Sequence, residues 1–116
     1  MDSLLDNDLL FDRTNGNFIE YHASGSTLIG SVGQIVNVAS PIPLNGKVLI
    51  ACDFKPDGKG DYGHADGLFV ETSLSSIPFY ECDSKQIQYL HELQQIFRAK
   101  FKKEMPVDLN RLLNAL

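Results

Sequence analysis

The sequence predicts an α+β fold, in which an antiparallel β-sheet of four to six strands packs against a long C-terminal helix and a short terminal helix. Before residue 83, short apolar runs are separated by Gly, Pro, Asn and Ser, as strands are separated by turns. After residue 83, apolar residues recur every three or four positions, as on a helix, at Ile87, Leu90, Leu93, Phe97 and Phe101. We expect the 116 residues to form one domain, with residues 1–82 mainly β and residues 83–116 helical.

Most of the first 82 residues are predicted to form short strands. Runs of strand formers bounded by turn residues lie at residues 17–22, 27–32, 34–39, 47–52, 68–72 and 77–80. Residues 2–11 are predicted to form a short helix instead. The short connections favour an antiparallel meander over parallel βαβ units. Pro41 and Pro43 exclude segment 40–44 from the middle of a sheet, because proline has no N–H for the ladder.

The Asn45-Gly46 pair predicts a tight hairpin turn, because these residues suit the positive φ angles of a type I′ turn. Residues 47–52 then form a nearly all-apolar run, so we expect a central strand covered on both faces. Cys52, at the end of this run, is predicted to be a small buried apolar residue. With Cys82 as the only other cysteine, the sequence indicates no disulfide framework.

The C-terminal third is predicted to contain two helices. Asp83 resembles a helix cap, with Gln86 three residues later as in a capping box. The helix is expected to reach about Lys103, because Pro106 prevents its continuation. Asp108 is the predicted cap of a second helix, whose apolar face carries Leu109, Leu112, Leu113 and Leu116.

The composition narrows the class of partner. A formal net charge of −5 disfavours nucleic-acid binding, because an acidic chain repels phosphate. The basic residues of segment 98–103 suit the carbonyl end of a helix. The acidic N-terminus is unlike a secretory signal, and no apolar run approaches the roughly 20 residues that span a bilayer. We therefore expect a soluble, cytoplasmic protein that binds neither nucleic acid nor membrane.

The polar, glycine-rich stretch 53–67 is the one place where chemistry could concentrate. The simplest interpretation is a solvated hairpin loop in which Gly permits turns and Asp accepts backbone hydrogen bonds. A functional interpretation is recognition of a basic partner, for which the candidate residues are Asp57, Asp61, Tyr62, His64 and Asp66. A third is a divalent cation site, but the spacing does not match an EF-hand loop and no second His or Cys lies at zinc-ligand spacing. We predict no metal and no cofactor.

Catalysis has weak support in the sequence. His64 with Asp61 or Asp66 could form an oriented general base, with Ser24, Ser26 or Thr27 as the nucleophile, but nothing in the sequence places these residues together. We therefore predict a non-enzymatic domain that occupies a partner protein's surface, as a small acidic inhibitor, immunity or accessory protein does. The alternatives are a subunit of a homo-oligomeric or phage-type assembly and a small metal-dependent or Asp/His hydrolase.

The leucine-faced tail has two interpretations. Its four leucines, Leu109, Leu112, Leu113 and Leu116, are expected to fold back onto the chain's own core, because a free apolar helix would be an exposed patch. Alternatively, they fill the groove of a partner or of a second copy in a homodimer.

Overall fold

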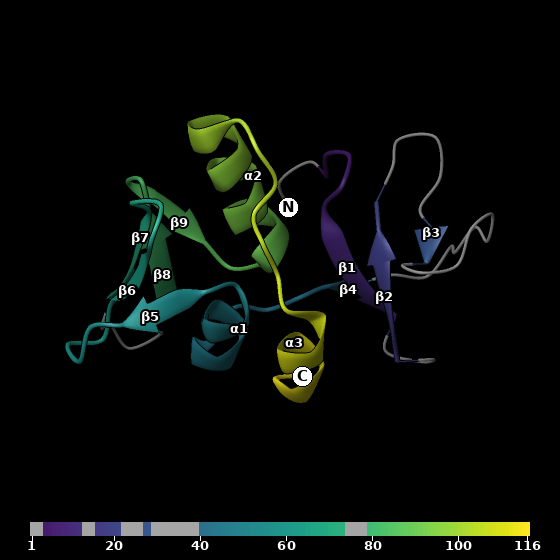
Figure 1. The fold of residues 1–116 in the computed structure, drawn as a ribbon, viewed down its shortest axis with the longest axis horizontal. Helices are drawn as coiled ribbons and strands as arrows, with labels where there is room; N and C mark the ends of the chain where they lie inside the picture. The colour runs from purple at the N-terminus through teal and green to yellow at the C-terminus, as the bar shows by residue number, and fades with distance from the viewer. Residues whose placement is uncertain (1–3, 13–15, 22–26, 29–39, 74–78) are drawn as a thin grey trace.

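The computed structural model describes residues 4–12, 16–21, 27–28, 40–73 and 79–116. Within these residues the chain forms antiparallel sheets and three helices, so the predicted α+β class is confirmed. The helices α1 (Gly46–Ala51), α2 (Leu90–Phe101) and α3 (Leu109–Asn114) lie between the two sheets (Figure 1). None of the helices in the described ranges is long and apolar enough to cross a membrane.

The first sheet has the strand order β3-β2-β1-β4. Its strands are β1 (Leu9–Asp12), β2 (Asn17–Glu20), β3 (Thr27–Leu28) and β4 (Ser40–Pro41). The predicted helix over residues 2–11 is wrong, because residues 9–12 pair with β2 and β4 instead. Pro41 lies in the last strand of the order, as its missing N–H predicts. The predicted strand at 34–39 and most of the one at 27–32 lie outside the described residues.

The second sheet is a meander in the order β5-β6-β7-β8-β9. Its strands are β5 (Phe54–Pro56), β6 (Tyr62–His64), β7 (Phe69–Ser73), β8 (Phe79–Cys82) and β9 (Lys85–Ile87). Strands β7 and β8 overlap the strands predicted at 68–72 and 77–80. The stretch 53–67, predicted as one long loop, instead contains β5 and β6, which form an antiparallel hairpin.

Helix α1 replaces the predicted central strand over residues 47–52. Asn45 has an extended backbone with a φ of −152°, and its side-chain oxygen accepts a hydrogen bond of 2.9 Å from the N–H of Val48. Asn45 is therefore a helix cap, and the predicted type I′ turn at Asn45-Gly46 is also wrong. Burial follows a helical pattern, since four residues face the interior: Val48, Leu49, Ala51 and Cys52. A short apolar run suits a buried helix as well as a strand, and here the cap selects the helix.

Helix α2 begins at Leu90, so the predicted start at Asp83 is wrong. Asp83 and Ser84 have φ angles of 51° and 65° and form the two-residue turn between β8 and β9. The helix start is supported by Glu92, whose carboxylate accepts hydrogen bonds of 3.0 Å from the N–H groups of Gln88 and Tyr89. The helix has 12 residues, fewer than predicted.

The hydrophobic core lies between the helices and the inner face of the β5–β9 sheet. Its largest fully buried side chains include Phe54, Leu68, Leu90, Leu93 and Phe97. Cys52 and Cys82 are free and buried, as predicted for Cys52, and burial raises the pKa of each thiol to about 12.

A buried ion pair connects the first sheet to helix α2. Asp8, which is fully buried, lies 2.8 Å from the Arg98 guanidinium and accepts a hydrogen bond of 2.7 Å from Gln95. Arg98 also pairs with Glu104 at 2.8 Å. Burial opposes the charge of Arg98, but its hydrogen bonds with Glu104 and Asp8 outweigh burial and raise its pKa. The Asp8–Arg98 pair has a structural role, because Arg98 balances the charge of a carboxylate that is fully buried.

Candidate functional site

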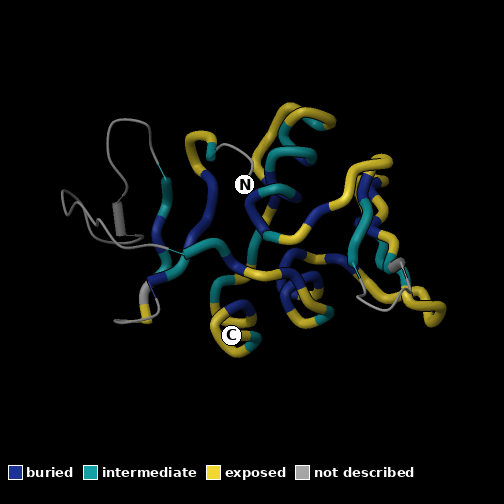
Figure 2. The backbone as a smooth tube through the Cα atoms, turned by 180° about the vertical axis from the view of Figure 1, so that it is seen from behind, coloured by how far each residue is buried: buried dark blue, intermediate teal, exposed yellow. Residues whose placement is uncertain are grey.

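The predicted partner-binding residues Asp57 and Asp61 lie together at the tip of the β5–β6 hairpin. The Asp57 carboxylate accepts hydrogen bonds from the N–H groups of Lys59 at 2.7 Å and Asp61 at 3.2 Å. The Asp61 carboxylate accepts one from Thr72 at 3.2 Å. The Asp57 carboxylate therefore stabilises the turn, as the simplest interpretation of the sequence predicted, and the Asp61 carboxylate connects the hairpin to β7. Figure 2 shows this tip as exposed.

The structure does not bring Asp66 and His64 to the same surface as the hairpin tip. Asp66 follows the opposite end of β6 and forms an ion pair of 3.0 Å with Lys103. The His64 ring is buried between Phe54 and Phe97, with ring centroids 5.1 Å from each. His64 therefore cannot contact a partner in this conformation, contrary to the exposed position that we predicted.

The His64–Asp66 pair, the alternative general base, is not arranged for proton transfer to a substrate. His64 Nδ1 accepts a hydrogen bond of 3.0 Å from the backbone N–H of Asp66, so the nitrogen nearest that carboxylate is already used. Asp66 Oδ2 lies 3.9 Å from the same nitrogen. Among the described residues, no group of three or more His, Cys, Asp or Glu side chains could hold a metal ion. Of the three candidate nucleophiles, Ser24 and Ser26 lie outside the described residues, and Thr27 lies in β3 of the first sheet whereas His64 lies in the second.

Tyr62 serves the core more than a surface. Its half-buried ring packs against the core, and its hydroxyl approaches helix α1 so closely that a Cβ atom at Gly46 would lie 2.6 Å from it. Gly46 is thus needed for this contact. Tyr62 lies on the inner face of the sheet, because its partner in the ladder is the buried Val70.

The leucine tail divides between the core and the surface. Asp108 caps helix α3 as predicted, accepting hydrogen bonds from Asn110 at 3.1 Å and Arg111 at 3.2 Å. Leu112 is fully buried and Leu109 is partly buried against the core, whereas Leu113 and Leu116 are 48% and 47% exposed. The tail therefore completes the chain's own core with one side of the helix and leaves two leucines at the surface.

The most unusual surface is the solvent-facing side of the β5–β9 sheet, which we call the outer face. Among the side chains that the structure describes, strand alternation places six there: Lys55, Phe69, Glu71, Phe79, Glu81 and Gln86. In Figure 1 the three helices all lie on the other side of this sheet. Phe69 is 64% exposed, the highest value among the large apolar residues described.

One feature of the outer face is costly for an isolated domain. Glu71 and Glu81 lie directly opposite each other on β7 and β8, and like charges at such a position destabilise a sheet. Phe69 lies across Gly63, where a Cβ atom would be 3.1 Å from its ring, so the glycine lets the aromatic ring lie flat on the strand. Our sequence analysis missed these residues, because Phe69 and Val70 are both apolar and no sequence pattern shows which of the two is exposed.

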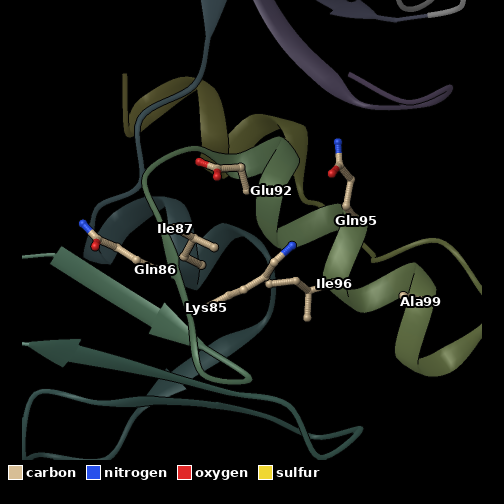
Figure 3. A pocket seen from close by; sticks show the side chains of 7 residues that line it. All are labelled: Lys85, Gln86, Ile87, Glu92, Gln95, Ile96 and Ala99. Atoms are coloured by element: carbon tan, nitrogen blue, oxygen red, sulfur yellow. The ribbon is translucent and has the colours of Figure 1, made fainter. Parts of the chain in front are cut away.

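A small groove lies at the β9 end of the sheet, between strand β9 and helix α2 (Figure 3). It encloses about 130 Å³ and is lined by Lys85, Gln86 and Ile87 from the strand and by Glu92, Gln95, Ile96 and Ala99 from the helix. Its size suits contact with another chain better than a small-molecule site.

Comparison of the chain with known protein families, with curated protein sequences and with solved structures finds no significant match.

Proposed function

We propose that this protein is a non-enzymatic binding domain that recognises the basic surface of another protein through its outer face. One observation carries the proposal: an exposed phenylalanine lies beside two glutamates that face each other across adjacent strands. An exposed aromatic ring provides a large contact area, and paired carboxylates attract a cationic partner and accelerate its association. A partner that supplied Lys or Arg between the two glutamates would turn their repulsion into attraction.

This proposal moves the contact surface away from three of the five predicted residues. Asp57 and Asp61 hold the hairpin turn at the border of the outer face and add negative charge there. His64, Asp66 and Tyr62 are committed to the core or to Lys103, so we assign them no contact. The proposed class of function, a small inhibitor, immunity or accessory protein, is unchanged. The free, buried thiols suit a reducing cytoplasm, which is the location that we propose.

The experiment is capture of binding proteins from the native host with wild type and variants. Phe69→Ser and the double variant Glu71→Gln/Glu81→Gln are expected to lose the partner while the thermal unfolding temperature is unchanged or higher. Leu113→Ser is the matched control for loss of exposed apolar area, because Leu113 is also half exposed but lies on α3.

Asp53→Asn is the matched control for loss of one carboxylate. Asp53 is exposed and has a φ of 68°, a conformation that Asn adopts readily. Both controls should retain the partner. Retention of the same partner by Phe69→Ser and by the double glutamate variant would refute the outer face as the binding surface.

A further inference from the structure

A cavity of about 440 Å³ lies between the first sheet and the C-terminal helices. The residues that line it come from both ends of the chain: Asn7, Leu9, Glu20, Gln94, Glu104, Met105, Val107 and Leu109. They meet because the connection from α2 to α3 runs on the side of α2 that faces the first sheet (Figure 1). The volume is typical of small-molecule sites, which enclose about 300–1,000 Å³. None of these residues belongs to the outer face, so the cavity is a separate feature of the molecule.

The apolar part of the lining is formed by four side chains, those of Leu9, Met105, Val107 and Leu109. The first two belong to the hydrophobic core and are each 5% exposed, whereas the other two are half-buried at its border. The connection is also anchored to α1, because the N–H of Asp108 donates a hydrogen bond of 2.8 Å to the C=O of Ala51. The protein therefore holds this apolar surface in place through its own contacts.

Gln94 adds a hydrogen-bond donor to the cavity. The residue is 5% exposed, and its side-chain oxygen accepts a hydrogen bond of 2.8 Å from the N–H of Leu9. This bond identifies the oxygen of the amide, because a backbone N–H can only donate. The amide nitrogen, Nε2, makes no hydrogen bond to any residue in the described part of the chain. Polar groups of buried residues normally have a partner, so an acceptor atom on a bound molecule would satisfy Nε2.

The charged side chains at the cavity are carboxylates. Glu20 and Glu104 line it, and its described lining residues include no Lys, Arg or His. Glu104 shares the guanidinium of Arg98 with the buried Asp8, each at 2.8 Å, so one cation balances two carboxylates. The Asp8–Arg98–Glu104 network therefore carries one negative charge in excess beside the cavity. A cation in the cavity would balance that charge, whereas an anion would be repelled.

We propose that this cavity binds a small organic cation, an amine or guanidine that has an apolar body and one hydrogen-bond acceptor. The cationic group lies beside the carboxylates of Glu20 and Glu104, and the apolar body covers Leu9 and Met105. The acceptor receives a hydrogen bond from Nε2 of Gln94. This proposal does not depend on the proposed function, because it uses neither the outer face nor the partner protein.

The test is an NMR titration with 6-amino-1-hexanol, which combines a protonated amine, an apolar chain and a hydroxyl acceptor at pH 7. The resonances of the Leu9 and Met105 amides and of the Gln94 side-chain amide should shift, with a dissociation constant of about 1 mM for so small a probe. Three matched probes isolate each element. The neutral 1-hexanol and the anionic 6-hydroxyhexanoate should bind at least about tenfold more weakly, and hexylamine, which lacks the acceptor, about threefold more weakly.

Variants locate the binding site. Glu20→Gln and Glu104→Gln should each weaken binding of 6-amino-1-hexanol about three- to tenfold, and Glu104→Gln leaves Arg98 its buried partner Asp8. Val107→Phe fills part of the cavity from its half-buried border and should abolish binding while the fold is retained. Asp53→Asn is the matched control, because it removes an exposed carboxylate far from these residues in the sequence and should bind as wild type does.

Several results would overturn the proposal. They are unchanged resonances at up to about 20 mM of 6-amino-1-hexanol, equal affinity for 1-hexanol or 6-hydroxyhexanoate, and wild-type affinity in Val107→Phe or in both glutamate variants. Tighter binding of Nα-acetyl-lysine methylamide than of 6-amino-1-hexanol would overturn the assignment to a free small molecule, because it would indicate a lysine side chain of another protein as the occupant.

Discussion

The replacement Glu71→Gln should stabilise the protein while weakening its binding. Glu71 and Glu81 are directly opposed across β7 and β8, and their Cβ atoms are about 5 Å apart in such pairs. Two unit charges about 6 Å apart in a medium like water repel by roughly 0.7 kcal/mol. Glutamine keeps the size of the side chain and removes one charge, so the free energy of unfolding should increase by about 0.5–1 kcal/mol.

Thermal unfolding followed by circular dichroism measures this increase. For a chain of this length, about 0.7 kcal/mol corresponds to an increase of roughly 2–4 °C in Tm. The increase should shrink in about 1 M salt, because the Debye length falls to about 3 Å there. Asp53→Asn should leave Tm unchanged, because it removes an exposed carboxylate that has no glutamate opposite it.

A lower Tm for Glu71→Gln, or an increase that salt does not reduce, would refute the reasoning from charge repulsion. In that case Glu71 would contribute a favourable interaction to the fold, and the argument that the outer face carries a cost in the isolated domain would fail. A higher Tm together with undiminished capture of the partner would leave the electrostatic reasoning intact but contradict the proposed function.

Three further predictions concern the fold. Arg98→Met leaves the buried Asp8 carboxylate without its cation and should lower the free energy of unfolding, measured in urea, by about 3–5 kcal/mol. The double variant Arg98→Met/Asp8→Asn should recover part of this loss. Burial raises the thiol pKa of Cys52 and Cys82 from 9.0 to about 12, so the folded state holds these protons more tightly than the unfolded state. The free energy of unfolding should therefore be unaffected below about pH 8 and should fall as the pH rises from 9 towards 12, by at most about 1.4 kcal/mol per pH unit for each thiol. Alanine at both positions should flatten the dependence of the urea midpoint on pH. Asn45→Ala removes the cap of α1 and should cost about 1 kcal/mol in the same assay, whereas an unchanged midpoint would contradict the capping role.

The sequence predicted an element correctly where its local signals were compatible with only one type of secondary structure. The spacing of Leu90, Leu93 and Phe97 requires a helix, and these three side chains are buried on one side of α2. Asp108 before the leucine-rich tail predicted the cap and start of α3 correctly. Pro41 correctly excluded its segment from the middle of a sheet, because the missing N–H acts in any fold.

Prediction failed where two structures satisfied the same local signals. The apolar run after Asn45-Gly46 fits a strand or a short helix, and Asp83 fits a helix cap or a turn residue. Pairing and packing made the choice: Asn45 caps α1 while Tyr62 packs over Gly46 at its start, and the Asp83–Ser84 turn allows β9 to pair with β8 before α2 begins.

By itself, the sequence determined the α+β class, the helical character of the C-terminal third and the acidic character of the surface, because periodicity, caps and charge are local properties. Only the tertiary structure decided which residues of the acidic hairpin are exposed. It buried His64 between Phe54 and Phe97 and paired Asp66 with Lys103. It also placed Glu71 opposite Glu81, and that juxtaposition, on which the proposed function depends, arises from strand register, which no local pattern specifies.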